Sequence, residues 1–263
     1  MAIRGTSNAT PVTDAAPAGP RRLPWRVAEV SEVVRETPRV VTLALRVPEW
    51  PGHLPGQHVD VRLTGDDGSE AQRLYSIASA PEEPLLSLTV ERIADGEVSP
   101  YLVAEVKAGD RFELRGPIGG HFVWTADLGG PLFLIAGGSG VVPLMAMLRH
   151  RLAVGSRVPA VLLYSSRSFE DVIYREELDR LAANGDGLRV VHTLTRTRPS
   201  GWAGLSRRID REMLAEDGFP VQSRPQVFIC GPTGLVEAAG QHLLHLGHEP
   251  GSIKTERFGP SGG

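Results

Sequence analysis

The chain has 263 residues, of which 41% are hydrophobic and 22% charged, and its formal net charge is −3 at pH 7. This length is comfortable for two domains, and the composition is ordinary for a globular enzyme. The small negative charge gives no reason to expect a nucleic acid or an anionic membrane as a partner, and no apolar run approaches the roughly 18 residues of a membrane span. Cys230 is the only cysteine, which excludes an intrachain disulfide and an iron–sulfur cluster held by cysteines of this chain alone.

Residues 1–22 are rich in Ala, Pro, Thr and Ser and show no hydrophobic periodicity. They lack the apolar centre of a secretory signal and are interpreted as a disordered leader. We therefore expect a cytoplasmic protein, without a membrane or nucleic-acid partner, that acts as a monomer.

Residues 23–128 follow a strand pattern. Alternating apolar residues predict strands at 39–47, 58–64, 86–90 and 111–115, separated by turns rich in Gly and Pro, with a helix at 99–106. Several short alternating strands of this kind predict a small antiparallel β-barrel.

Residues 131–263 alternate between strands and helices, and the boundary between the two patterns lies near Gly129 and Gly130. The pattern predicts strands at 131–138, 160–166, 188–194, 226–230 and 252–258, and helices at 141–152, 170–182 and 232–246. Such alternation predicts a doubly wound parallel sheet covered on both faces, so the fold class is a β-barrel followed by an α/β domain.

The stretch LIAGGSGVVPLMAMLRH at 134–150 joins the first of these strands to its helix. Gly137, Gly138 and Gly140 allow close backbone approach to a diphosphate at the helix N-terminus. Pro143 takes the place of a third motif glycine, and near the first helical turn its missing N–H costs nothing. A tight turn without a ligand is the alternative interpretation.

The stretch AQRLYSIASAP at 71–81 contains Arg73, Leu74, Tyr75 and Ser76 on a strand. One interpretation is an edge strand with an exposed arginine and a packed tyrosine. The other is a flavin site in which Arg73 meets phosphate, Tyr75 lies against the isoalloxazine and Ser76 donates a hydrogen bond near flavin N5.

Together, these motifs resemble the ferredoxin–NADP reductase family, whose flavin-binding barrel carries R-x-Y-[ST] and whose nucleotide-binding domain opens with G-G-[ST]-G-x-x-P. Four more segments match in order over residues 25–258: PGQHV at 55–59, GEVSPYL at 96–102, RGPIGGHF at 115–122 and CGPTGLVEAA at 230–239.

The resemblance implies one non-covalent FAD, with FMN as the alternative, and no metal. It implies that the cofactor-binding residues on the flavin side are Arg73, Leu74, Tyr75, Ser76, Val90, Gly96, Val98, Ser99 and Phe258. On the nucleotide side they are Gly137, Gly138, Ser139, Gly140, Pro143, Ser166, Arg167, Thr195, Arg196, Cys230, Gly231 and Pro232. Tyr75, Ser76, Cys230 and Glu256 are the candidate catalytic residues.

Three of these residues also have plainer explanations. Cys230 ends a strand and could simply pack in a core, whereas its place in C-G-P implies contact with the nicotinamide. Glu256 and Phe258 could belong to an ordinary edge strand, whereas relatives bring a carboxylate and a terminal aromatic close to the flavin.

We expect NADPH rather than NADH as the nucleotide, although NADH is possible. An NAD-selective fold places an acid at the end of the second strand to bind the ribose 2′-hydroxyl. Here Ser165-Ser166-Arg167-Ser168 stands at that position, and Thr195-Arg196-Thr197-Arg198 at the end of the third strand resembles the pair that holds the 2′-phosphate in relatives. Exposed arginines in polar loops are the alternative.

The resemblance implies an oxidoreductase that passes a hydride from NADPH to FAD and single electrons to a separate ferredoxin or oxygenase component. A reductase of small acceptors such as free flavin or quinone, and a flavin-binding redox sensor, are the alternatives. Arginines crowd the start of the barrel, which is typical either of a docking surface for an acidic ferredoxin or of a solvated face: Arg21, Arg22, Arg26, Arg35 and Arg39.

Overall fold

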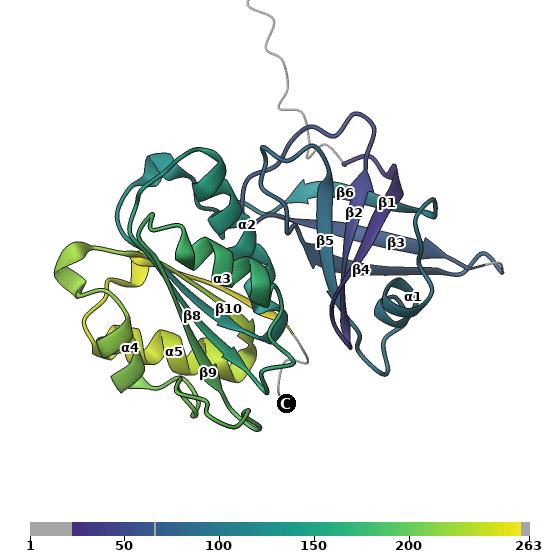
Figure 1. Ribbon diagram of the computed structural model, residues 1–263. Coiled ribbons are helices and arrows are strands. Elements are labelled where there is room, and N and C mark those ends of the chain that lie inside the picture. Colours follow the sequence, from purple (N-terminus) through teal and green to yellow (C-terminus); the bar gives the residue numbers. More distant parts are fainter. Residues whose placement is uncertain (1–22, 66, 259–263) are drawn as a thin grey trace, which may run out of the picture.

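The computed structural model describes residues 23–65 and 67–258, so the leader expected at 1–22 lies outside the described residues. Two sheets stand side by side, an antiparallel one in the N-terminal half and a parallel one in the C-terminal half (Figure 1). Within the described ranges, no helix is long and apolar enough to cross a membrane.

The described residues of the N-terminal half form six strands and one short α-helix, α1 (Ser99–Ala104). Its strands are β1 (Arg26–Thr37), β2 (Val40–Arg46), β3 (His58–Thr64), β4 (Glu70–Ser76), β5 (Leu86–Glu91) and β6 (Arg111–Ile118). The sheet order is β4-β3-β6-β1-β2-β5, with every neighbouring pair antiparallel. An antiparallel bridge between Ile77 and Leu88 brings the two edge strands together, so the sheet curls into a barrel around an apolar interior.

In the C-terminal half, the part of the chain that the structure describes forms five parallel strands in the order β11-β10-β7-β8-β9. They are β7 (Leu132–Gly137), β8 (Ala160–Ser166), β9 (Leu188–Leu194), β10 (Gln226–Pro232) and β11 (Ile253–Phe258). The chain starts in the middle with β7, builds outward through β8 and β9, then returns to the other side of β7 with β10. The strand order therefore reverses between β7 and β10, which is where open α/β sheets bind ligands.

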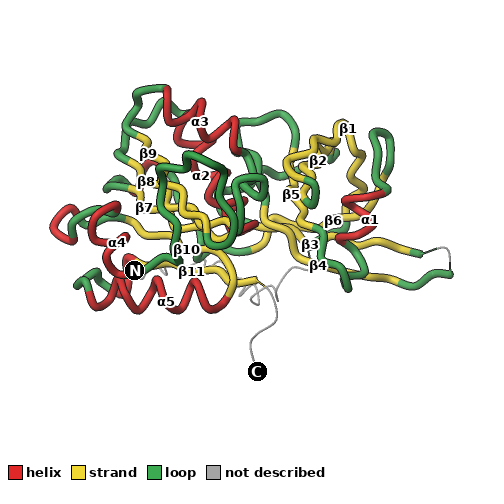
Figure 2. Tube along the Cα trace, turned by 60° about the horizontal axis from the view of Figure 1, so that its bottom comes forward, coloured by secondary structure: helices red, strands yellow, loops and turns green. Residues whose placement is uncertain are grey.

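Two pairs of helices cover this sheet (Figure 2). The helices α2 (Val141–Ala153) and α3 (Arg175–Ala183) pack on one face, and α4 (Arg211–Asp217) and α5 (Thr233–His245) pack on the other. The alternation along β7 accounts for this, because Leu132, Leu134 and Ala136 face α2 while Phe133 and Ile135 face the opposite core. Four short 3-10 turns are also described: η1 (Ala126–Leu128), η2 (Gly138–Gly140), η3 (Val221–Ser223) and η4 (Pro250–Ser252).

The predicted fold class is confirmed, one predicted helix start needs correction, and two elements were not predicted. Helix α3 begins at Arg175 and not at residue 170, because residues 167–173 form turns and Tyr174 takes a left-handed conformation with φ 58°. Strand β1 and helix α4 carry too little hydrophobic periodicity to have been predicted. Asp210 caps α4 by accepting a hydrogen bond from Met213 N, 2.9 Å away.

The two halves share part of one core. Val40, Ala78, Phe122 and Trp124 of the N-terminal half belong to the same buried cluster as the residues of α2. Helix α2 accordingly lies between the parallel sheet and the barrel in Figure 1. Ala78 lies two residues beyond the end of β4, the strand that carries Arg73-Leu74-Tyr75-Ser76 (the flavin strand). It thus packs in the same core as α2, the helix that follows Gly137–Gly140 (the glycine turn).

Candidate flavin and nucleotide sites

The glycine turn lies at the carboxyl end of β7, at the point where the strand order reverses. Gly138–Gly140 form η2 and lead directly into α2, whose N-terminus has no side-chain cap. The N–H of Val141 already donates to Gly138 O within η2, so the N–H groups at this helix entrance that have no partner within the helical segment are those of η2 itself, and such groups attract anions. Pro143 is the third residue of α2, where a backbone N–H is not needed.

Close packing explains why three positions of this turn and its neighbour are glycine. A Cβ on Gly140 would lie 2.1 Å from the carbonyl oxygen of Cys230, and one on Gly137 would lie 2.7 Å from Leu235 Cδ1. A Cβ on Gly231 would lie 3.1 Å from Gly137 N. The glycine turn therefore packs directly against the start of the Cys230-Gly231-Pro232 segment. These two motifs lie about ninety residues apart in the sequence.

A cleft of about 650 Å³ opens at this switch point. Nine of the residues predicted to bind cofactors line it: Gly137, Gly138, Ser139, Ser166, Arg167, Thr195, Arg196, Pro232 and Phe258. The loops after β8 and β9 are joined here by backbone hydrogen bonds, with Thr195 N donating to Ser166 O (3.0 Å) and Arg196 N to Arg167 O (2.9 Å). The two arginines predicted near the adenosine are thus brought to one wall.

Other residues of this cleft were not predicted from the sequence. Arg208 adds a third guanidinium from the segment before α4, and Asp171 adds a carboxylate whose Oδ2 accepts from Ser168 Oγ at 3.1 Å. Arg39 and Glu91 come from the barrel and form an ion pair at 3.1 Å. No local signal marks them, because their places depend on how the loops return and how the halves dock.

The cleft suits a phosphorylated dinucleotide. The buried Ser166 hydroxyl has no hydrogen-bond partner among the described residues, although it lines the cleft. A buried polar group normally has a partner, so an unpaired one at a concave wall indicates a place for a ligand. Uncapped helix N–H groups for a diphosphate and three arginines for further phosphate complete a donor set that fits NAD(P).

Cys230 and Glu256 lie beside each other on neighbouring strands, because the β10–β11 register pairs them. Cys230 is 4% exposed, and burial, with a smaller contribution from the charge of Glu256, raises the pKa of its thiol far above the usual range. The thiol therefore stays protonated and is no nucleophile. Burial also raises the pKa of Glu256 to about 7, so this carboxyl is near half-ionised at neutral pH.

The flavin-side residues lie on the barrel. Arg73 on β4 pairs with Glu97 at 2.8 Å, which joins the R-L-Y-S strand to the Gly96–Ser99 segment ahead of α1. Leu74 is 62% exposed, and Tyr75 is half-buried with the pKa of its hydroxyl raised to about 12 by burial. Ser99 Oγ accepts a hydrogen bond from Ile93 N at 3.0 Å.

These residues fit a flavin nucleotide. An apolar side chain and an aromatic ring lie next to a cation, and the N-terminus of α1 has no side-chain cap. Val90 and Val98 are fully buried in the barrel interior, so their side chains pack beneath the surface that carries the exposed flavin-side residues. Of the predicted flavin contacts, only Phe258 also lines the nucleotide cleft.

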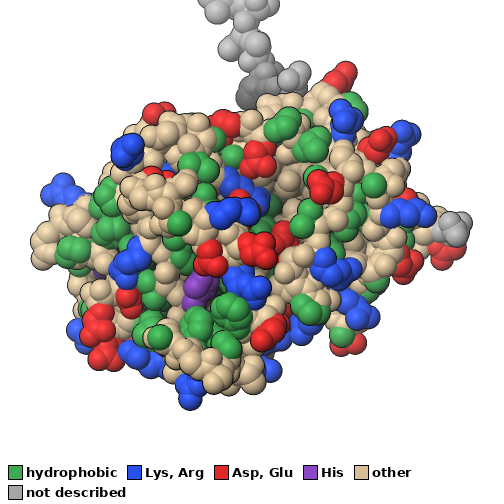
Figure 3. Space-filling view, in the orientation of Figure 1, with side chains coloured by type: hydrophobic (Ala, Val, Ile, Leu, Met, Phe, Trp, Pro, Cys, Tyr) green, Lys and Arg blue, Asp and Glu red, His purple; other side chains and the backbone are tan. Residues whose placement is uncertain are grey.

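Of the described arginines at the start of the barrel, Arg39 is paired with a carboxylate, whereas Arg26 and Arg35 donate to backbone carbonyls; Arg21 and Arg22 lie outside the described residues. Arg26 Nε donates to Glu49 O at 3.2 Å, Arg35 donates to the Val103 carbonyl at 3.3 Å, and Arg39 pairs with Glu91. On the face shown in Figure 3, basic and acidic side chains are interspersed.

Comparisons with known families identify both domains. Residues 25–124 match the family described as oxidoreductase FAD-binding domain, and residues 134–241 match the oxidoreductase NAD-binding domain. The chain is 38% identical over 202 residues to ferredoxin–NADP reductase B of Sorangium cellulosum, an alignment that covers 73% of this chain and 80% of that protein.

A second relative is longer than this chain. The chain is 32% identical over 212 residues to the glycine betaine monooxygenase reductase subunit of Pseudomonas aeruginosa, covering 79% of this chain but only 56% of that protein. Among solved structures, the FAD/NAD-binding domain of nitric oxide dioxygenase from Vibrio cholerae has a TM-score of 0.79 at 26% identity, covering 89% of this chain and 99% of that one.

Proposed function

Because the chain belongs to the ferredoxin–NADP reductase family of FAD- and NAD(P)-binding oxidoreductases, we propose that it passes a hydride from NADPH to FAD and then single electrons to a separate acceptor protein. The cleft at the β7/β10 switch point carries this proposal, because it joins an uncapped helix entrance, an unpaired buried hydroxyl and three arginines. The flavin, when bound, supplies the two-electron to one-electron conversion.

The residues of this chain hold and align the two cofactors. The backbone of Gly137–Gly140 receives the dinucleotide diphosphate, and Arg73 with the N-terminus of α1 receives the flavin phosphates. Tyr75 lies against the isoalloxazine and Ser76 donates near N5. Cys230, a small neutral group at the end of β10, contacts the nicotinamide without reacting with it.

Charge in the cleft supports NADPH over NADH. Arg167, Arg196 and Arg208 give three cations for a 2′-phosphate, whereas the carboxylate of Asp171 already accepts from Ser168 and that of Glu91 pairs with Arg39. A guanidinium binds phosphate in a bidentate, charge-assisted manner.

The acceptor is a separate redox protein in this proposal. Cys230 is the only cysteine, so the chain supplies no four-thiolate cluster of its own. The two relatives described above are named as a ferredoxin reductase and as the reductase subunit of a monooxygenase. A ferredoxin or an oxygenase component is therefore the class of acceptor to seek.

The test begins with the purified protein and its chromophore. We expect a yellow protein that releases one FAD per chain on heating, identified by chromatography, and whose colour bleaches rapidly when NADPH is added without oxygen. Absence of any flavin contradicts the proposal, and release of FMN changes the cofactor. Bleaching too slow to support turnover favours a redox sensor.

A second experiment identifies the acceptor. The untagged protein is purified from its host, and the proteins that accompany it are identified by mass analysis.

A further inference from the structure

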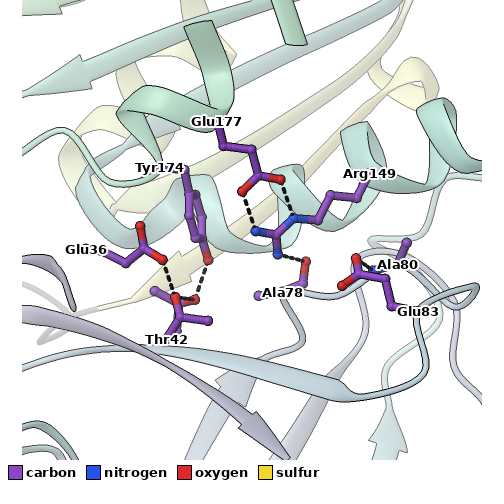
Figure 4. A network of polar contacts seen from close by, with 9 residues as sticks. Glu36, Thr42, Ala78, Ala80, Glu83, Arg149, Tyr174 and Glu177 are labelled. Carbon is purple, nitrogen blue, oxygen red and sulfur yellow. Dashed lines mark hydrogen bonds and ion pairs between the residues drawn. The ribbon is translucent and has the colours of Figure 1, made fainter. Parts of the chain in front are cut away.

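Three polar links join the barrel to the helices α2 and α3, and none of them belongs to the cofactor sites described above. In the first, His150 Nδ1 on α2 lies 2.8 Å from Glu82 Oε1 of the barrel. The other two are drawn in Figure 4. One runs from Arg149 on α2 to the backbone of Ala78. The other runs from Tyr174, at the start of α3, to Thr89 on β5. Each crosses between the two halves of the molecule.

Arg149 is fixed on every side. Its guanidinium pairs in a fork with both carboxylate oxygens of Glu177 (2.9 and 2.7 Å) and lies 5.0 Å from the centre of the Tyr174 ring. The remaining nitrogen, Nη1, donates to the carbonyl oxygen of Ala78 at 2.8 Å. With the side chain only 15% exposed, this donor has one fixed direction, toward the barrel.

Tyr174 opens a chain of hydroxyl groups with a defined direction. Its hydroxyl bonds to Thr89 Oγ1, which lies 2.8 Å from Thr42 Oγ1, and Thr42 donates to Glu36 Oε1 at 2.7 Å. A carboxylate oxygen only accepts, so Thr42 donates to it, Thr89 donates to Thr42, and Tyr174 donates to Thr89. Every hydroxyl proton in this chain is therefore assigned.

The links of Arg149 and Tyr174 attach to segments that bear the cofactor sites. Ala78 lies two residues after Ser76, at the end of the flavin strand, and Arg149 is on the helix that begins at the glycine turn. Tyr174 directly follows Ile173, which lines the nucleotide cleft. Its left-handed backbone (φ 58°) is rare for a bulky residue and is retained only where the surroundings fix it.

We propose that Arg149 and Tyr174 are positioning residues that fix the flavin strand relative to the glycine turn, and so set the alignment of the two rings for hydride transfer. This inference rests on the proposed function. The shared apolar core also joins the halves, but hydrophobic packing is non-directional, whereas hydride transfer needs a near-attack separation of about 3–3.5 Å and aligned orbitals. Directional hydrogen bonds supply the defined relative orientation of the two halves that apolar packing alone does not.

The decisive variants separate positioning from stability. Thr89→Val leaves the Tyr174 hydroxyl without its acceptor, and Tyr174→Phe removes the donor. Replacing both partners by apolar groups of the same shape restores most of the stability that the single change at Thr89 loses. A structural role predicts that flavin reduction recovers together with stability in the Tyr174→Phe/Thr89→Val variant. A positioning role predicts that reduction stays slow.

Flavin reduction by NADPH is measured by anaerobic stopped-flow, with thermal unfolding of each protein alongside. We expect the rate at saturating NADPH to fall about three- to tenfold in Tyr174→Phe/Thr89→Val, and up to about a hundredfold when Arg149→Gln is added, because a misplacement near 1 Å costs about that much. The NADPH concentration for half-maximal rate stays within about twofold, since neither Arg149 nor Tyr174 lines the nucleotide cleft. The control is Arg189→Gln, which breaks the Arg189–Asp217 ion pair (2.8 Å) inside the C-terminal half and leaves the rate unchanged.

A second readout does not depend on activity. Nitroxide labels at Ser31→Cys on the barrel and Arg180→Cys on α3, both exposed positions, report the distance between the halves, while buried Cys230 escapes labelling. We expect one narrow distance distribution in the parent, a broad one in the triple variant, and a narrow one with Arg189→Gln. Narrow distributions in all three, or a triple variant that is reduced as fast as the parent, overturn the inference. A parent whose flavin neither nucleotide reduces contradicts the proposed function instead, and the distances then decide the inference.

Discussion

The two candidate sites are built from different parts of the chain. The nucleotide site is made mostly by backbone at the end of buried strands, where Gly140 and Cys230 touch so closely that a Cβ would lie 2.1 Å from a carbonyl oxygen. The flavin site is made by side chains on the barrel surface, where Leu74 is 62% exposed and the Arg73 side chain 53% exposed. A side chain added at the glycine turn of the first site must disturb the fold, whereas a change at the exposed side chains of the second removes only a contact.

The largest effect is expected for Gly140→Ala. Gly140 has φ −63°, which any residue can adopt, so lack of space alone excludes a side chain. Overpacking of this kind destabilises by about 1–3 kcal/mol, and the shifted turn should slow flavin reduction by NADPH about a hundredfold. Thermal unfolding and anaerobic bleaching measure the two effects.

The control for this variant is Gly240→Ala in α5, where nothing lies within 4 Å of an added Cβ. This change should stabilise the protein by about 0.5–1 kcal/mol, because alanine loses less backbone freedom in a helix. If both variants unfold at the same temperature as the parent, the contact between the glycine turn and β10 is not as tight as described.

The next effect in size concerns selectivity between nucleotides. Arg196→Ala should lower the efficiency with NADPH about ten- to a hundredfold, since a hydrogen bond to a charged group contributes about 1.5–3 kcal/mol. The efficiency with NADH should hardly change, because NADH has no 2′-phosphate. Steady-state kinetics with both nucleotides and an artificial acceptor measure this. Arg198→Ala, an exposed arginine of the same loop that does not line the cleft, is the control. An equal loss of efficiency with NADPH and NADH would show that Arg196 does not bind the 2′-phosphate.

On the flavin side, Tyr75→Ala should weaken flavin binding by about 1–3 kcal/mol, as for aromatic stacking on a nucleic-acid base. Tyr75→Phe keeps the ring and should retain the flavin. Equilibrium dialysis of the released flavin gives the dissociation constants, and unfolding of the flavin-free proteins shows whether the barrel itself is intact. If Tyr75→Ala binds flavin as tightly as the parent, Tyr75 only packs on the barrel and does not contact the flavin.

The same contrast explains what could be predicted from the sequence. The glycine turn, the C-G-P segment and the alternation of strands and helices along the chain are local patterns, so both motifs were located, and the structure brings them into contact. The R-L-Y-S strand was located for the same reason. Their roles toward cofactors remain predictions.

Residues that reach the cleft or the interface between the halves from distant parts of the sequence were not predicted. Arg208 reaches the cleft only because the segment after β9 folds back, with Thr193 pairing to Leu205. Arg39 reaches it only because the barrel docks there, and Arg149 bonds a carbonyl 71 residues away. The start of α3 was placed too early because the acids at 170 and 171 look like a first helical turn, while the left-handed Tyr174 delays the helix.

The last prediction concerns Glu256, which lies between the two sites in character: a side chain on a strand, and half-buried. Its pKa of about 7, raised by burial from the ordinary 4.5, means that the folded protein holds this proton more tightly than the unfolded chain does. Its contribution to stability is therefore fully present below pH 4.5 and is lost as the pH rises through 7.

Glu256→Gln removes the ionisable group, so the variant should gain in melting temperature relative to the parent across pH 4.5–7, with the difference constant above about pH 7.5. Thermal unfolding of both proteins in a pH series measures this, and Glu249→Gln at an exposed carboxylate controls for the loss of a charge. A difference that does not vary with pH would place Glu256 in water, as exposed as the side chains of the flavin strand.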